Sequence, residues 1–315
     1  MKYISQFKEG DSIVGIYLCR MKNLAQTKNG KDYLNLTLAD KTGTVNCKIW
    51  DPDGIGIGDF EANDYIEVHG RVSVFNGALQ MSVDRAFEAG EGTYDPADYL
   101  PVSPKNIDRM WEELLGYINS LKSPYFKLLL ESFFVNDAEF ISEFRRHSAA
   151  KSVHHGFVGG LLHHTLSVTK LCDFYCTQYP NLNRDLLITG AICHDIGKVA
   201  ELSDFPANDY TDEGQLIGHI VMGVEMIDEK LRDINGFPKK RANELRHLIL
   251  SHHGEFEFGS PKKPALIEAI ALNFADNTDA KLETMSELLA SAVPGEGSKW
   301  LGYSKLLDSN IRPTD

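Results

Sequence analysis

The hydrophobic residues of this 315-residue chain change their period once, and that change limits what the chain can fold into. Up to about residue 90, apolar and polar residues largely alternate in short β-rich stretches, which is typical of half-buried strands. From Ile107 onward, apolar residues share one helical face, as at Met110, Leu114 and Ile118, which indicates amphipathic helices. The sequence therefore predicts a multidomain protein, with a small all-β domain followed by an all-α domain.

The first part of the chain predicts five strands, at residues 13–24, 33–40, 44–51, 65–75 and 78–88. Turn residues separate these segments, and Asn76-Gly77 is a strong signal for a hairpin. Five strands of this length suit a small closed barrel of the OB type, which we place at residues 1–90. The stretch from Thr27 through LADKTGTVNCKIW also resembles the first strands of nucleic-acid-binding OB domains.

The rest of the chain divides into three further parts. Residues 91–148 are predicted to be a linker and connecting helices, because residues 91–105 hold three prolines and no periodicity. Helical segments then alternate with short loops, and we place the all-α domain at residues 149–292. The tail at residues 293–315 is rich in glycine and polar residues, and we expect it to pack loosely or to contact another subunit of a homo-oligomer.

Charge and cysteine content narrow the functional classes. The net charge of −13 argues against a general nucleic-acid coating protein, but an enzyme that binds nucleic acid locally through metal ions fits. No apolar run approaches the roughly 20 residues that span a bilayer, and the first residues lack a secretion signal. The five cysteines show no CxxC spacing, which favours free thiols. We expect a cytoplasmic protein with no membrane partner.

Imidazole and carboxylate side chains occur at the ends or on the apolar faces of successive predicted helices. Such groups are ligands of divalent cations, and an enclosed cluster of them is costly without a metal. The candidates are His164, His194, Asp195, His219, His252, His253 and Asp276. Each alone is weak evidence, since a lone histidine is more often a hydrogen-bonded core residue. Asp276 has the alternative of pairing with Lys198.

One pair of candidates lies at a predicted helix end. The helix begins after Asn183, a suitable N-cap, and reaches His194 and Asp195 just before Gly197, which offers a left-handed turn. Adjacent ligands there project into open space, where a carboxylate can bridge two cations. Lys198 follows at once and could meet a phosphate oxygen.

The series H…HD…H…HH…D resembles the HD-domain phosphohydrolase superfamily over about residues 149–290. The resemblance implies an all-helical domain in which one metal is held by His164, His194, Asp195 and Asp276. It implies a second metal, separated from the first by Asp195, that is held by His219, His252 and His253.

Together with the predicted OB domain, the chain resembles the YhaM-type 3′→5′ exoribonucleases, cytoplasmic bacterial enzymes with HD chemistry and a manganese preference. The segments HHGFVGGLLHHTLSV and FADNTDAK are particularly similar to the sequence motifs of that family. His163 departs from the pattern, in which an acid often precedes the ligand histidine. His154 and His155 stand beside the motif with no assigned role.

The resemblance implies a metal-dependent phosphodiesterase. Two divalent ions, manganese first and cobalt, iron or zinc as alternatives, would activate a water against the phosphodiester. The 3′-terminal nucleotide of single-stranded RNA or DNA would then leave as a nucleoside 5′-monophosphate. The catalytic candidates are Asp195, between the metals, and Lys198, which would steady a non-bridging oxygen.

The barrel would hold the single strand by stacking bases on aromatic side chains, at roughly 1–3 kcal/mol each. The aromatic candidates, two of which could instead fill the barrel, are Tyr17, Tyr33, Trp50 and Phe75. The basic candidates are Arg20, Lys22, Lys28, Lys31 and Lys48.

Two other functions stay open at this point. The first is an HD hydrolase of small nucleotides, such as cyclic dinucleotides, alarmones or dNTPs, with the barrel as a regulatory or oligomerising module. The second is a non-catalytic nucleic-acid adaptor with a vestigial helical domain. A 5′-labelled oligonucleotide discriminates, because only the exonuclease would produce a descending ladder.

Overall fold

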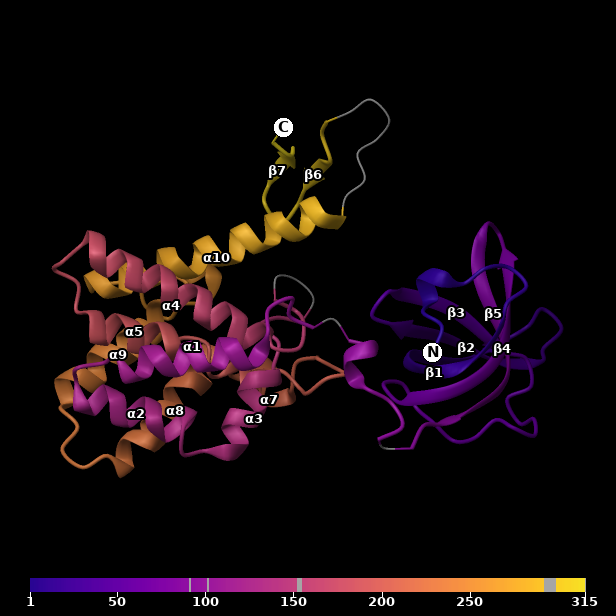
Figure 1. Cartoon of the computed structure of the whole chain (residues 1–315), viewed down its shortest axis with the longest axis horizontal. Coiled ribbons are helices and arrows are strands. Elements are labelled where there is room, and N and C mark those ends of the chain that lie inside the picture. Colours follow the sequence, from indigo (N-terminus) through magenta and orange to yellow (C-terminus); the bar gives the residue numbers. More distant parts are fainter. Residues whose placement is uncertain (91, 101, 152–154, 292–298, 315) are drawn as a thin grey trace. The chain divides into compact units, whose positions relative to one another are not determined.

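The computed structural model describes residues 1–90, 92–100, 102–151, 155–291 and 299–314. The chain forms two compact units, Met1–Pro101 and Val102–Asp315. The first is a closed β-barrel and the second is helical, as Figure 1 shows. The predicted order of a β domain followed by an α domain is therefore confirmed.

The strands of the barrel are β1 Ser12–Gln26, β2 Asp32–Asp40, β3 Gly43–Ile49, β4 Tyr65–Phe75 and β5 Ala78–Glu88. They close in the order β1-β2-β3-β5-β4, with β3 and β5 parallel and the other neighbours antiparallel. Each segment that the alternating pattern predicted as a strand is one. Closure matters because an open sheet would leave unpaired edge strands that can bind other chains.

Alternation along the strands places one set of side chains inside the barrel and the other outside. On β2, Leu34, Leu36 and Leu38 are buried. The Asn76-Gly77 turn between β4 and β5 has positive φ at both residues, 51° and 80°, as the predicted hairpin requires.

Residues that follow the barrel strands pack onto the same unit. A short 3₁₀ turn, η2 Pro96–Asp98, leads into Tyr99 and Leu100, which are both buried. The ring of Tyr94 stacks on Tyr65 of β4 at 4.1 Å between ring centroids. Part of the segment 91–105 therefore has a defined place on the barrel.

The second unit is built from helices around a shared apolar core. They are α1 Ile107–Asn119, α2 Pro124–Phe134, α3 Ala138–Arg146, α4 Gly160–Gln178, α5 Arg184–Cys193, α6 Lys198–Glu201, α7 Asp212–Leu216, α8 His219–Asp233, α9 Lys239–Ser251 and α10 Ile267–Ser291. The predicted N-cap, Asn183, accepts a hydrogen bond from the Leu186 backbone N–H. Every residue from Leu186 to Cys193 in α5 is buried, so this helix lies inside the unit.

The central position of α4 and α5 determines where polar groups can meet. α4 packs against α1, α3, α5 and α10, and α5 packs against α9 and α10. Polar groups on these inner helices are removed from water and must find partners within the protein. That requirement makes the buried histidines and aspartates informative.

The chain ends in a small hairpin of β6 Gly302–Ser304 and β7 Ser309–Ile311. Ile311 is buried, so the hairpin has an apolar anchor of its own. Across the described residues, none of the helices combines the length and apolar character that crossing a membrane would need.

Candidate metal centre

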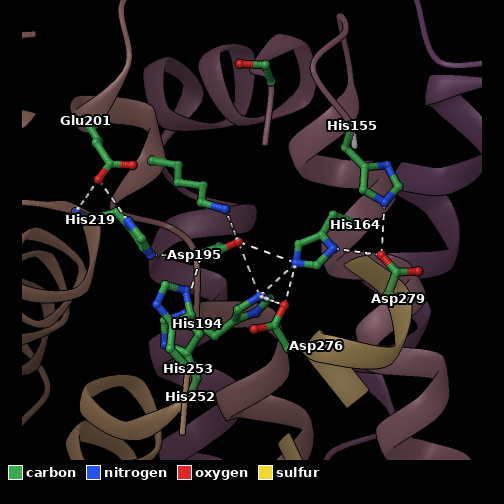
Figure 2. A network of polar contacts seen from close by, with 12 residues as sticks. His155, His164, His194, Asp195, Glu201, His219, His252, His253, Asp276 and Asp279 are labelled. Atoms are coloured by element: carbon green, nitrogen blue, oxygen red, sulfur yellow. Dashed lines mark hydrogen bonds and ion pairs between the residues drawn. The ribbon is translucent and has the colours of Figure 1, made fainter. Parts of the chain in front are cut away.

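The predicted ligands come from separate helices and meet inside the second unit, as Figure 2 shows. α4 carries His164, the end of α5 carries His194 and Asp195, and α10 carries Asp276. His219 is the first residue of α8, and His252 follows directly after α9 with His253. These residues are far apart in sequence, so only the packing of the helices brings them together.

One set of ligand atoms surrounds His164. Its Nε2 atom lies 3.1 Å from Nε2 of His194 and 3.1 Å from Oδ1 of Asp276. Oδ2 of Asp195 lies 3.3 Å from Nε2 of His194 and 3.5 Å from Nε2 of His164. Imidazole nitrogens and carboxylate oxygens therefore converge on one small space.

A second set lies on the other side of Asp195. Oδ1 of Asp195 is 3.4 Å from Nε2 of His219 and 3.6 Å from Nε2 of His252. His219, His252 and His253 each offer a ligand atom, all within 4.8 Å of one another. Asp195 thus turns one carboxylate oxygen toward each set.

The opposite ring nitrogens are held by the backbone. Nδ1 of His194 donates to the Ala191 carbonyl oxygen at 2.8 Å, and Nδ1 of His252 donates to that of Ile249 at 2.7 Å. Nδ1 of His253 contacts the carbonyl oxygen of Phe258 at 2.7 Å. A carbonyl oxygen can only accept, so the proton is on Nδ1 and the Nε2 lone pair faces the centre.

Three of the residues predicted to bind nucleic acid lie together on the barrel. The rings of Tyr33 and Trp50 lie 5.1 Å apart, and Nζ of Lys48 lies 5.1 Å from the Tyr33 ring centre. Lys31 stands nearby in sequence, with Nζ 3.9 Å from Asp51.

The other barrel candidates lie elsewhere. Phe75 is exposed at the β4–β5 turn and Arg20 is exposed on β1. Tyr17 is different, because it is fully buried inside the barrel and donates to the Lys2 carbonyl oxygen at 2.6 Å. Its expected role as a base-stacking residue is therefore wrong, and the alternative that it fills the barrel holds.

Comparison with known proteins agrees with both units. A family model described as an HD domain matches residues 161–281, and one described as an OB-fold nucleic acid binding domain matches residues 19–88. The 3′-5′ exoribonuclease YhaM of Bacillus velezensis is 34% identical over 94% of this chain and 93% of its own length. The chain belongs to the YhaM family. YhaM of a Geobacillus species is 33% identical, over 94% of this chain and 90% of its own.

Among solved structures, the second OB-fold domain of replication protein A from Methanococcus maripaludis covers 30% of this chain and 98% of its own. Its sequence identity is 23% and its TM-score is 0.23, which is too low to carry an argument.

Three atoms of the centre test whether a metal fits. Oδ1 of Asp195 and the Nε2 atoms of His219 and His252 are buried, and no hydrogen-bond partner exists for them among the described residues. Each buried group left in this state costs about 1–3 kcal/mol. All three atoms belong to the second set, so one divalent cation there would satisfy them together. The residues of this family member therefore fit a divalent metal.

Charge is balanced around Asp195 and His164. Burial raises the pKa of Asp195, but Lys198, with Nζ 2.7 Å from Oδ2, and His194 hold it well below its usual range. Burial likewise opposes protonation of His164, yet hydrogen bonds to Asp276 and Asp279 raise its pKa to about 10. The first set thus favours positive charge at its centre. Lys198 forms its ion pair with Asp195, and Asp276 instead contacts His164 and His194.

Two acids that the sequence analysis did not assign orient the imidazoles. Asp279 accepts from Nδ1 of His164 at 2.7 Å, and Glu201 accepts from Nδ1 of His219 at 2.9 Å. Asp279 stands three residues after Asp276 on α10, and that helical spacing could have indicated it. Glu201 has no such signal, because the contact depends on how α6 meets α8.

The extra histidines are now placed, except His154, which lies outside the described residues. His155 is fully buried, and its Nε2 contacts Oδ2 of Asp279 at 2.9 Å. Nδ1 of His163 lies 3.2 Å from Oγ of Ser103, and burial lowers its pKa to about 3. His155 therefore supports the centre through Asp279, and His163 belongs to a neighbouring buried contact.

Gly197 has a different role from the one expected. Its φ of −63° is right-handed, so the predicted left-handed turn is wrong. A Cβ atom added there would lie 2.1 Å from the backbone oxygen of His219. Glycine is needed because the turn after Asp195 and the start of α8 approach closely, and this approach brings His219 to Asp195.

Proposed function

We propose that this chain is a metal-dependent 3′→5′ exonuclease that acts on single-stranded RNA and releases nucleoside 5′-monophosphates. The observation that carries the proposal is Asp195, whose two oxygens face separate groups of imidazoles in a buried site. The YhaM relatives, which match both units, carry the name 3′-5′ exoribonuclease.

We propose two divalent ions in this site. The first would be held by His164, His194, Asp195 and Asp276. The second would be held by Asp195, His219, His252 and His253. A mixture of imidazole nitrogen and carboxylate oxygen suits manganese, with cobalt, iron or zinc as alternatives, better than magnesium.

The metal ions, when bound, supply an activated water and neutralise charge that develops on the phosphate. The chain's own residues do the rest. Lys198 keeps Asp195 ionised from 2.7 Å away and lines the same cavity, where its ammonium would meet a phosphate oxygen. Asp279 and Glu201 hold the rings of His164 and His219, so the Nε2 atoms stay aimed at the centre.

The barrel would bind the strand upstream of the cleaved nucleotide. The faces of strands 2 and 3 are where OB barrels bind oligonucleotides, and Tyr33, Lys48 and Trp50 belong to β2, β3 and the residue that follows. A polar row accompanies them: Nδ2 of Asn46 donates to Oδ1 of Asn35, and Nε2 of Gln80 donates to Oδ1 of Asn46. We assign Lys31 to the same surface, and Arg20 on β1 and Phe75 at the end of β4 to contacts elsewhere on the barrel.

Hydrolysis of small nucleotides is the weaker alternative. Similarity to the YhaM relatives extends over 94% of the chain and includes the barrel, which favours a polymer substrate. A vestigial helical domain is weaker still, because every ligand of the series is present. Cellular RNA as the substrate also makes the cytoplasm the proposed location.

The test is cleavage of a 5′-labelled single-stranded oligonucleotide with Mn²⁺, on RNA and DNA in parallel. We expect a descending ladder from RNA and loss of the ladder in His194→Ala with the fold retained, as judged by circular dichroism. An intact oligonucleotide beside efficient cleavage of cyclic dinucleotides or dNTPs would contradict the proposal. Unchanged cleavage by His194→Ala would remove the proposed site.

A further inference from the structure

A large cavity leads from the metal centre to the surface of the second unit. Its volume is about 1030 Å³, and Asp195, Lys198 and Asp276 line its inner end. Ligand pockets commonly measure about 300–1,000 Å³, so this cavity has room for more than a mononucleotide. A substrate that reaches the centre through it would contact the outer walls as well.

The outer walls carry exposed aromatic side chains. Phe258 follows the loop after α9 and is 66% exposed, and Phe274 on α10 is 59% exposed. Single exposed apolar residues are ordinary on protein surfaces, but these two line one cavity that also holds the metal ligands. Phe258 is additionally tied to the centre, because its carbonyl oxygen contacts Nδ1 of His253 at 2.7 Å.

Amide and cationic side chains share the same helix face. Asn273, Asn277 and Lys281 follow one another at intervals of four residues along α10, and all three line the cavity. Nδ2 of Asn273 donates to the His252 carbonyl oxygen at 2.7 Å. Lys281 forms no ion pair with any residue that the structure describes, so its charge is available in a strongly acidic chain.

The C-terminal hairpin contributes another wall. Leu306 and Leu307 lie in the turn between β6 and β7 and line the cavity. The HD-domain match ends at residue 281, so this wall lies beyond the matched part of the domain. The cavity is therefore lined in part by a segment outside the residues that match the HD-domain model.

We propose that this cavity binds the 3′-terminal nucleotides of a single strand. Bases stack on Phe258 and Phe274, Leu306 covers them from the hairpin, and Lys281 meets a backbone phosphate upstream of the cleaved bond. Stacking suits any base, because every base offers a flat face, and the site therefore fits sequence-tolerant trimming. This inference rests on the proposed exonuclease function and adds residues that bind the strand next to the metal centre.

The experiment compares two substrates of the full-length protein with Mn²⁺. One is a 5′-labelled single-stranded RNA oligonucleotide, and the other is bis(p-nitrophenyl) phosphate, which needs the metal centre but offers no strand. For Phe258→Ala and Phe274→Ala, we expect the ratio of kcat/KM on RNA to kcat/KM on the small diester to fall about tenfold. A smaller fall in the same direction is expected for Leu306→Ala.

Matched controls are available in the same unit. Phe256→Ala and Phe174→Ala remove phenylalanines that are 62% and 56% exposed but do not line this cavity, and we expect them to keep the wild-type ratio. Lys281→Gln should reduce the salt dependence of RNA binding by about 0.7 in the slope of log K against log salt.

Each result bears on a different claim. If the cavity variants keep the wild-type ratio while wild type still produces a ladder, the inference is overturned and the exonuclease function stands. If they lose both activities equally, they act through the metal centre, and the inference is again overturned. If wild type cleaves the small diester but yields no ladder, the exonuclease function fails and the inference falls with it.

Discussion

The metal centre and the aromatic face of the barrel are built in opposite ways. The ligands of the centre are withdrawn from water: His194 and His252 are fully buried, and Asp195 is 2% exposed. Trp50 on the barrel is 46% exposed, and Tyr33 is half-buried. Buried polar groups depend on one another, whereas exposed groups act almost singly. The metal centre should therefore be intolerant of single changes, and the aromatic face of the barrel tolerant.

The strongest test of this contrast is Asp195→Asn. Asparagine keeps the size of the side chain but removes the charge that both groups of imidazoles and Lys198 face. We expect exonuclease activity to fall to background and bound metal to be lost, measured by the RNA ladder and by elemental analysis. Activity within tenfold of wild type would show that the carboxylate does not connect the two groups.

A smaller effect is expected from Asp279→Asn. This acid touches no proposed metal directly, but it holds His164 and His155 through their ring nitrogens. Acids in this position are worth about 10–100-fold in metal affinity, and we expect a loss of that size in a calorimetric Mn²⁺ titration. Glu283→Gln, one turn further along α10, is the control. Equal affinities in both variants would argue that Asp279 has no positioning role.

On the barrel, Trp50→Ala should weaken binding of single-stranded RNA about tenfold, since one stacked base is lost. Fluorescence anisotropy without added metal measures this binding and avoids cleavage. Ile55→Ala removes a fully exposed apolar side chain of the same unit, and this variant should bind RNA like wild type. Hydrolysis of a small diester should not respond to either change. If it does, the two regions are not separable in the way we describe.

The smallest expected effect is a pH dependence of stability in the helical unit. His147 is buried, and that burial lowers its pKa, although its ring contacts the Ser148 and Leu202 carbonyl oxygens. The unfolded chain, with a histidine pKa of about 6.5, then binds more protons than the folded one below that pH. The contribution of neutral His147 to the free energy of unfolding is therefore present above pH 6.5. It is lost as the pH falls toward the lowered pKa of His147 in the folded state.

Urea unfolding at pH 5 and pH 8 measures this dependence. We expect the difference in unfolding free energy between the two pH values to be smaller in His147→Gln than in wild type, because glutamine does not titrate. The barrel contains one histidine, His69, which is partly exposed, so a probe on Trp50 should report a weaker dependence. An equal pH dependence of unfolding in the helical unit and in the barrel would contradict the difference that we describe between them.

Much of the barrel could be predicted because its signals are local. A strand in a half-buried sheet alternates with period two, and Asn76-Gly77 adopts the two positive φ values that its hairpin needs. Local reasoning failed where several segments meet. Tyr17 looks like an exposed aromatic in the sequence, yet the closure of the barrel buries it.

The centre shows the same division. His252 and Asp276 could be picked out because a polar residue on an apolar helix face needs a partner, and His194 because it lies at the end of a predicted helix. Glu201 could not, since its contact with His219 arises from the meeting of two helices. The preference of glycine for left-handed turns at helix ends predicted such a turn at Gly197. Glycine is required there for another reason, because the backbone of α8 lies too close for a side chain.

The sequence by itself determined the order of the two units, the positions of strands and helices, and the types of ligand available. Those properties follow from periods of two and 3.6 residues and from side-chain chemistry, which act over short stretches of chain. Only the tertiary structure decided that Asp195 turns one oxygen to each set, and that the Nε2 atoms rather than Nδ1 face inward. Those choices depend on how distant helices pack, because packing alone determines which backbone carbonyl or acid reaches each ring.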